Sequence, residues 1–258
     1  MPLKDSSYHV VLIAVLGAWS VLPVSIANYI FYLLILVVAS CIGRAGYEHA
    51  KLRREAWLGQ YLKASSTLRK PLAVGVISWF YIFPLATFLS VILLLNLRSG
   101  GLAVWGAVLF GFLVFQWSTR SLARKVEEHV IEKSVAPIVR KVSTLPAAMI
   151  MITLSVMVSL SIPHPNVKGM SWLDVMGRGT AQIEGSGILP FLELLHLGVG
   201  LTEYWAIQNT IETLGTPVML NVLGWTLFFI SECAFVWAFC RLMVGVDSLR
   251  ARFSEHDV

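Results

Sequence analysis

The apolar residues of this chain lie in long continuous blocks, separated by shorter segments that hold most of the charged residues. Within these blocks the only Asp, Glu, Lys or Arg is Glu232. A helix that crosses a bilayer needs about 20 consecutive, mostly apolar residues. The pattern therefore predicts an all-α fold, a polytopic transmembrane helical bundle forming a single membrane domain over residues 1–258. The blocks cover residues 10–42, 72–97, 102–117, 145–162 and 218–240.

The first block allows two interpretations. As one helix, its 33 residues would be about 50 Å long, well beyond a hydrocarbon thickness of about 30 Å. Pro23 and the nearby Asn28 favour a turn, which would divide residues 8–43 into two short spans. We therefore favour six spans in total. One long kinked helix over 8–43, giving five spans, is the alternative.

The distribution of charge predicts the orientation. Residues 44–70 contain seven Lys or Arg against two Glu, and residues 118–144 contain six against three. Residues 163–216 contain only two Lys or Arg against five Asp or Glu. Short loops rich in Lys and Arg stay in the cytoplasm. The resulting topology has basic cytoplasmic loops at 44–70 and 118–144, a transmembrane hairpin at 72–117, spans at 145–162 and 218–240, an external segment at 163–216 and a cytoplasmic tail at 241–258.

Both basic segments show apolar residues at helical spacing and are expected to form amphipathic cytoplasmic helices. Such helices attract anionic lipid, at about 1 kcal/mol per basic residue near the surface. The alternative is a docking surface for a protein partner, with exposed aromatic side chains as anchors. Nucleic acid is not expected as a partner. The candidate residues for lipid or partner docking are Arg53, Arg54, Trp57, Tyr61, Arg124 and Lys125.

The external segment is also predicted to be helical. Ser171 followed by Asp174 resembles a helix start with an acidic residue in the first turn. Residues 202–214 have the spacing of a second helix, ended by Gly215 and Pro217. Between them, residues 188–201 are apolar but too short to span, which indicates an interfacial or re-entrant segment.

Glu232 is the strongest candidate for a functional residue. It lies near the middle of block 218–240, with no formal charge within eight residues on either side. Such a carboxyl costs at least about 2.5–3.5 kcal/mol to insert, so it faces the bundle interior or water. Ser155 and Ser159, one turn apart in 145–162, are its candidate partners. The site is either a proton or cation site, or a structural hydrogen bond of a protonated glutamate.

Composition agrees with a membrane protein and reveals no catalytic motif. The chain is 57% hydrophobic and 14% charged, with a mean hydropathy of +0.73, whereas soluble domains carry about 25% charged residues. It lacks a P-loop, a nucleophile elbow and an H-E-x-x-H motif. Glu193 and His196 form a single Glu-x-x-His pair, although di-iron bundles need two. No metal and no cofactor are predicted.

These features predict a non-enzymatic integral membrane subunit of a transport, secretion or other membrane-bound assembly. A buried acid would provide ion or proton coupling, and further membrane or cytoplasmic subunits would be its partners. One alternative is a stand-alone channel-forming or membrane-perturbing effector. Another, ranked lowest, is a lipid-modifying membrane enzyme using Glu193, His196 or Glu203. The basic loops suggest a bacterial inner membrane.

Overall fold

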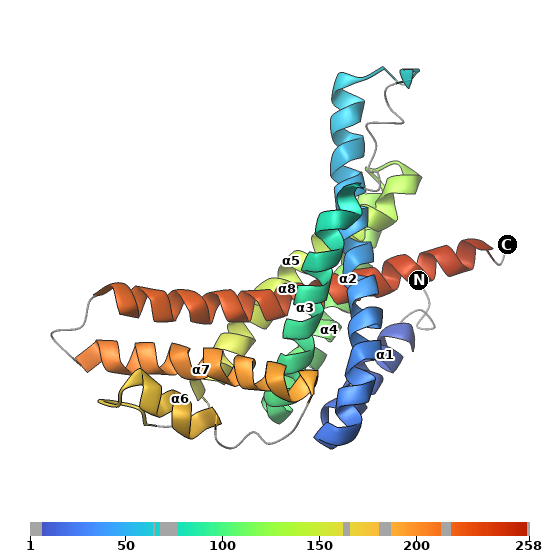
Figure 1. Cartoon of the computed structure of the whole chain (residues 1–258). Helices are drawn as coiled ribbons and strands as arrows, with labels where there is room; N and C mark the ends of the chain where they lie inside the picture. The colour runs from blue at the N-terminus through green and yellow to red at the C-terminus, as the bar shows by residue number, and fades with distance from the viewer. Residues whose placement is uncertain are drawn as a thin grey trace.

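The computed structural model describes residues 7–63, 65–67, 77–161, 166–180, 187–212 and 218–256. Within these ranges the secondary structure consists of helices, with no strand. Figure 1 shows their arrangement. The helices are α1 (Ser7–Ser20), α2 (Val24–Tyr61), α3 (Ile77–Ser99), α4 (Gly101–Glu127), α5 (Glu132–Ser161), α6 (Trp172–Thr180), α7 (Ile188–Glu212) and α8 (Val218–His256).

Five of the helices in the described part of the chain are long and apolar enough to cross a membrane: α2, α3, α4, α5 and α8. Helix α1 is apolar but has only 14 residues, fewer than the roughly 20 that a span needs. The predicted all-α transmembrane bundle is confirmed. The described residues thus provide five candidate spans by length and composition, one fewer than the six favoured. The single kinked helix over 8–43 that would also give five is absent, because α1 and α2 are separate helices.

The predicted turn in the first block is present, but it lies nearer the N-terminus than the middle. Helix α1 ends at Ser20 and α2 begins after Pro23, whose φ of −53° and ψ of 143° are extended. The indole N–H of Trp19 donates to the Ala27 carbonyl across this turn, at 3.1 Å. The second part is therefore a full-length span, because α2 continues from Val24 far beyond residue 43.

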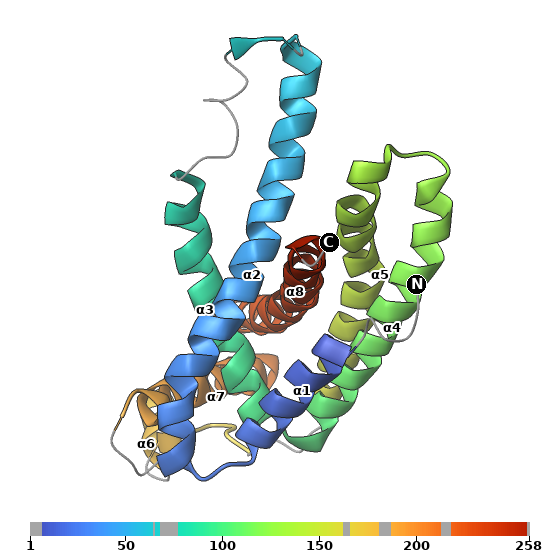
Figure 2. The ribbon, with the colours of Figure 1, turned by 90° about the vertical axis from the view of Figure 1, so that its right-hand side faces the viewer.

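The segments predicted as basic loops are largely extensions of the spanning helices. Helix α2 runs unbroken to Tyr61, and α5 runs from Glu132 through both Pro137 and Pro146. A proline in a helix removes one internal hydrogen bond, but packing of α5 along α4 keeps the helix continuous. The described basic ends of α2, α4 and α5 lie at one end of the bundle, and the α3–α4 connection lies at the other (Figure 2).

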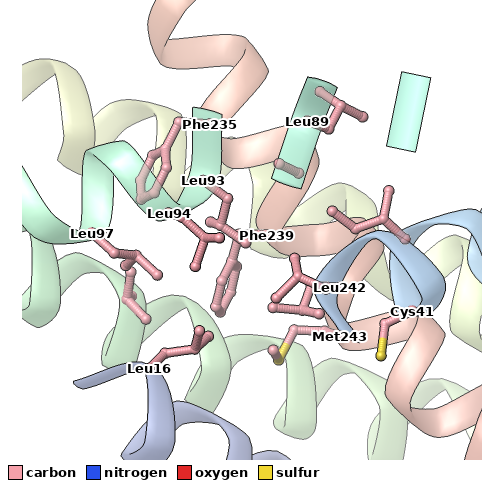
Figure 3. Close-up of a cluster of buried hydrophobic side chains, with 14 of the residues drawn as sticks. Leu16, Cys41, Leu89, Leu93, Leu94, Leu97, Phe235, Phe239, Leu242 and Met243 are labelled. Carbon is pink, nitrogen blue, oxygen red and sulfur yellow. The ribbon is translucent and has the colours of Figure 1, made fainter. Parts of the chain in front are cut away.

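Helix α8 is the central helix of the bundle. In Figure 2 it is seen nearly end-on, between the α2–α3 pair and the α4–α5 pair. Half of its most apolar stretch is buried, the highest share among the five long apolar helices. Its Phe235, Phe239, Leu242 and Met243 meet leucines of α3 in the main core (Figure 3).

The segment predicted as a cytoplasmic tail, 241–258, continues α8 as far as His256. Leu242, Met243 and Val244 are fully buried, because α8 continues through the bundle. His9 of α1 lies 3.1 Å from the Met243 carbonyl oxygen and 3.5 Å from an Asp247 carboxylate oxygen. Leu242, Met243, Val244 and Val246 are therefore part of the core.

Helices α6 and α7 occupy the segment predicted to be external, and the predicted helical structure is present there. Ser171 caps α6, since its hydroxyl accepts from the Asp174 backbone N–H at 3.2 Å. Helix α7 is one continuous helix, so the predicted division near residue 201 is absent; residues 213–217 lie outside the described residues. Trp205 donates to the Met170 carbonyl oxygen at 2.9 Å, and a small apolar cluster around Val175 and Leu201 joins α6 to α7.

Candidate functional site

A polar cavity of about 210 Å³ lies where α7 and α8 meet the junction of α3, α4 and α5. In Figure 1, α7 and the first half of α8 lie side by side and cross α3 at a steep angle. The cavity therefore collects side chains from five helices. Its polar lining consists of Asn96, Ser99, Ser155, Ser159, His196, Glu203, Tyr204, Ser231 and Glu232.

Glu232 lies in this cavity and is hydrogen-bonded to one of its two predicted partners. The Ser159 hydroxyl of α5 donates to Glu232 Oε1 at 2.6 Å. Ser155, one turn earlier on α5, is buried and lines the same cavity. The spacing of the two serines thus directs both toward the α8 carboxyl, and the three candidate residues of the proton or cation site come together.

Glu203 of α7 is a second carboxyl in the same cavity. It is only 6% exposed, and its Oε1 has no hydrogen-bond partner in the structure. Burial, reinforced by the negative charge of Glu232, raises the pKa of Glu203 from 4.5 to about 7. Two carboxyls, one from α7 and one from α8, therefore interact across the cavity, and near neutral pH Glu203 exchanges its proton.

His196 and Asn96 complete the polar lining on the side of α3. His196 Nε2 lies 3.1 Å from the Ser99 hydroxyl, and burial lowers its pKa below 6.5. The Asn96 amide donates back to the Ile92 carbonyl oxygen at 3.0 Å. The neutral imidazole and the amide leave the two carboxyls as the acidic groups of the cavity.

Helix α7 is fixed in place by two contacts with the bundle. Asn28 of α2 accepts a hydrogen bond from the Leu189 backbone N–H at 3.0 Å, which satisfies one of the free donors in the first turn of α7. Arg98 at the end of α3 forms an ion pair with Glu193, with Nε and Oε1 2.5 Å apart. These contacts orient the face of α7 that carries His196 and Glu203.

The sequence interpretation assigned Glu203 to an external enzyme site and missed its proximity to Glu232. His196, Val199, Gly200 and Glu203 all line the cavity, and their spacing is that of one helix face. This spacing is visible in the sequence. The predicted boundary near residue 201, however, placed the four residues in two different elements.

The polar groups of the cavity are mainly oxygen atoms. Two carboxyls and four serine hydroxyls offer oxygen ligands and hydrogen-bond partners. Across the described ranges, no group of three or more His, Cys, Asp or Glu side chains is arranged to hold a metal ion. The negative charge of Glu232 acts on Glu203 and favours its protonated form.

The residues predicted for lipid or partner docking lie at the opposite, basic end. Trp57 and Tyr61 are exposed near the end of α2, with ring centroids 5.1 Å apart. The Arg54 guanidinium lies 4.9 Å from the centroid of the Trp57 ring. Arg53, Arg124 and Lys125 are also exposed. These side chains do not contribute to the polar cavity.

Together, the five long apolar helices and the buried central helix define an integral, multi-spanning α-helical membrane protein. Comparison of the chain with protein-family models, curated proteins and solved structures finds no match.

Proposed function

We propose that this chain is a non-enzymatic subunit of a transport or secretion assembly in a bacterial inner membrane, and that its polar cavity is a proton-binding site. The observation that supports the proposal most directly is the pair of carboxyls, Glu203 and Glu232, between helices of an otherwise apolar bundle. Glu232 lies on α8, one of the helices apolar enough to span a membrane, and ionisable groups in such helices are costly and mark ion and proton pathways.

The cavity has the properties that reversible protonation requires. Glu203 has a pKa of about 7, so a modest change in local pH changes its charge. Glu232 is held by Ser159, whose hydroxyl can donate to the ionised carboxylate or accept from the protonated acid. Binding of a proton removes a negative charge between α7 and α8, which alters the electrostatic energy of their contact.

Any active transport by this chain needs an external source of energy. The sequence contains no P-loop for nucleotide binding. The energy would come either from an ion gradient, through the carboxyl pair, or from a partner ATPase at the basic end. The basic ends of α2, α4 and α5, on one side of the bundle, fit a cytoplasmic location under the positive-inside rule.

Purification of the full chain in a lipid-preserving detergent, followed by mass spectrometry, tests the assembly. We expect stoichiometric membrane or cytoplasmic subunits to copurify. A chain that purifies alone and releases dye from liposomes would instead be a channel-forming effector, and the subunit proposal would be wrong.

Infrared spectroscopy of the full chain in lipid nanodiscs tests the proton site. We expect a protonated-carboxyl band that titrates near neutral pH, that is lost in Glu203→Gln and that titrates at lower pH in Glu232→Gln, because the charge that helps to raise the pKa of Glu203 is then removed. Glu55→Gln is the control, since Glu55 is exposed on α2. A band that is identical in all three variants would contradict proton binding in the cavity.

A further inference from the structure

A second cavity, of about 280 Å³, lies at the other end of the bundle between α2, α3 and α8. Two of its lining residues are arginines, Arg53 of α2 and Arg241 of α8. Around them lie Gly46, Tyr81, Leu85 and Trp237. The cavity is therefore both cationic and apolar, and it shares no lining residue with the polar cavity.

Neither arginine forms an ion pair with a carboxylate among the described residues. The charge that acts on Arg241 is another cation, Arg53. Glu48 of α2 pairs with Arg140 of α5 instead. Two guanidinium groups that repel one another without a carboxylate between them would be stabilised by an anion.

Gly46 and Trp237 position the Arg241 guanidinium in the cavity. Gly46 leaves room for the guanidinium, because a Cβ at this position would lie 3.2 Å from Arg241 Nη1. The Arg241 guanidinium lies 5.1 Å from the centroid of the Trp237 ring, a cation–π contact that orients it. Arginine presents its N–H groups in a planar fork that suits phosphate oxygens.

The apolar wall of the cavity identifies the type of anion. Tyr81, Leu85 and Trp237 are exposed large hydrophobic side chains on helices long and apolar enough to span a membrane. Such surfaces lie against lipid acyl chains, whereas a soluble anion needs no apolar wall. The arginines also lie at the basic end of the bundle, and the cytoplasmic leaflet is the one enriched in anionic lipid.

We propose that the Arg53–Arg241 cavity binds the phosphate of an anionic phospholipid, whose acyl chains pack against Tyr81, Leu85 and Trp237. Bidentate contacts from the two guanidinium groups hold the phosphate between α2 and α8. The lipid thereby links the basic end of α2 to the central helix.

Native mass spectrometry of the full chain, released from nanodiscs of phosphatidylcholine mixed with phosphatidylglycerol, tests this site. We expect the wild-type protein to retain phosphatidylglycerol with a preference of about tenfold, or about 1.4 kcal/mol, since the choline cation of phosphatidylcholine offsets the phosphate charge that the two guanidinium groups attract. Arg53→Gln/Arg241→Gln should lose the preference. Lys51→Gln/Arg120→Gln removes the same formal charge from exposed positions outside the cavity and should keep it.

A single substitution tests the site even if the double variant does not fold. Arg53 is exposed, so Arg53→Gln should fold, as circular dichroism would verify, and still lose most of the preference. Arg53→Lys keeps the charge but not the fork, and should retain an intermediate preference. Equal loss in the Lys51→Gln/Arg120→Gln control would overturn the proposal in favour of general surface attraction.

The source of the phosphate is tested separately. In nanodiscs of phosphatidylcholine alone, inorganic phosphate should not raise the thermal unfolding midpoint of the wild-type protein, whereas phosphatidylglycerol should raise it. Stabilisation by inorganic phosphate that is lost in Arg53→Gln would identify a soluble-anion site and overturn the lipid assignment.

Discussion

The Ser159 hydroxyl of α5 donates a hydrogen bond of 2.6 Å to Glu232 Oε1 of α8, although the two residues are 73 positions apart. This contact joins a peripheral spanning helix to the central helix at the polar cavity. Interhelical polar contacts in membranes stabilise by about 0.6–2 kcal/mol. The contact therefore contributes to stability as well as to the proposed proton site.

Replacing Ser159 tests that contribution. Ser159→Ala should lower the free energy of unfolding by about 1–2 kcal/mol, because it leaves Glu232 without the hydroxyl donor. Ser161→Ala is the matched control on the same helix, since the Ser161 hydroxyl bonds only to the Met157 carbonyl oxygen one turn away. Thermal unfolding in nanodiscs measures both. Equal effects of the two substitutions would show that the contact with Glu232 is not stabilising.

The stability of the protein should depend on pH through Glu203. In the folded protein its pKa is raised from 4.5 to about 7, so between these values the folded state holds a proton that the unfolded state has released. The free energy of unfolding contributed by Glu203 therefore falls as the pH rises through this window. Above the pKa of Glu203 in the folded protein, the free energy of unfolding from this residue falls no further.

Glu203→Gln should remove the pH-dependent part of the free energy of unfolding that Glu203 contributes. His196 acts in the opposite direction, because burial lowers its pKa and folding then favours its neutral form. The difference between wild-type protein and Glu203→Gln isolates the glutamate from the histidine. Unfolding midpoints of both proteins from below pH 4.5 to above pH 7 measure it, and a constant difference across that range would refute the assignment.

The close approach of α2 and α8 predicts a strong effect at Gly245. A Cβ on this residue would overlap the carbonyl group of Cys41, and that obstacle is backbone, which cannot rotate away. Gly245→Ala should therefore cost about 3 kcal/mol or more and reduce the yield of folded protein. In Gly59→Ala the new Cβ meets nothing within 4 Å, so this exposed control should be neutral or stabilising by up to about 1 kcal/mol. Comparable yields of the two variants in fluorescence size-exclusion chromatography would contradict the predicted packing.

The pairing of Glu232 with α5 could be predicted because an isolated acid in an apolar block needs a polar partner, and Ser155 and Ser159 lie one turn apart. The contribution of Glu203 could not be assigned in the same way. It depends on α7 being one helix that lies against α8, and no local pattern specifies that tertiary contact. The structure brings His196 and Glu203 onto one face only because the predicted boundary near residue 201 does not exist.

The predicted span at 218–240 ends immediately before Arg241, whereas α8 continues to His256. Charge normally marks the edge of the membrane, yet Leu242, Met243 and Val244, which follow Arg241, are fully buried. The Arg241 guanidinium instead extends into the cavity between α2 and α3. An arginine inside a bundle resembles an interfacial arginine in sequence, and only the position of the neighbouring helices distinguishes them.

Arg98 forms a largely buried ion pair at the end of α3. Its Nη1 lies 3.0 Å from the carbonyl oxygen of Leu22, just after α1, and 3.3 Å from that of Ser20, the last residue of α1. Its Nε pairs with Glu193, and the two side chains are only 11% and 23% exposed. One guanidinium thus connects α1, α3 and α7 at the end of the bundle nearest the polar cavity.

Arg98→Gln should therefore destabilise the protein by about 3 kcal/mol, because it leaves the Glu193 carboxylate uncompensated and frees the α1 carbonyl groups. Arg98→Gln/Glu193→Gln should recover part of that loss, since the unpaired charge is gone. The coupling energy from this double-mutant cycle should exceed 1 kcal/mol. The exposed Lys51–Glu55 pair, at 3.8 Å and more than half exposed on both sides, should give about 0.5 kcal/mol or less in the same measurement. Equal coupling energies in the two cycles would show that the Arg98–Glu193 pair stabilises no more than an exposed ion pair. The position of α7 beside the cavity would then depend on other contacts.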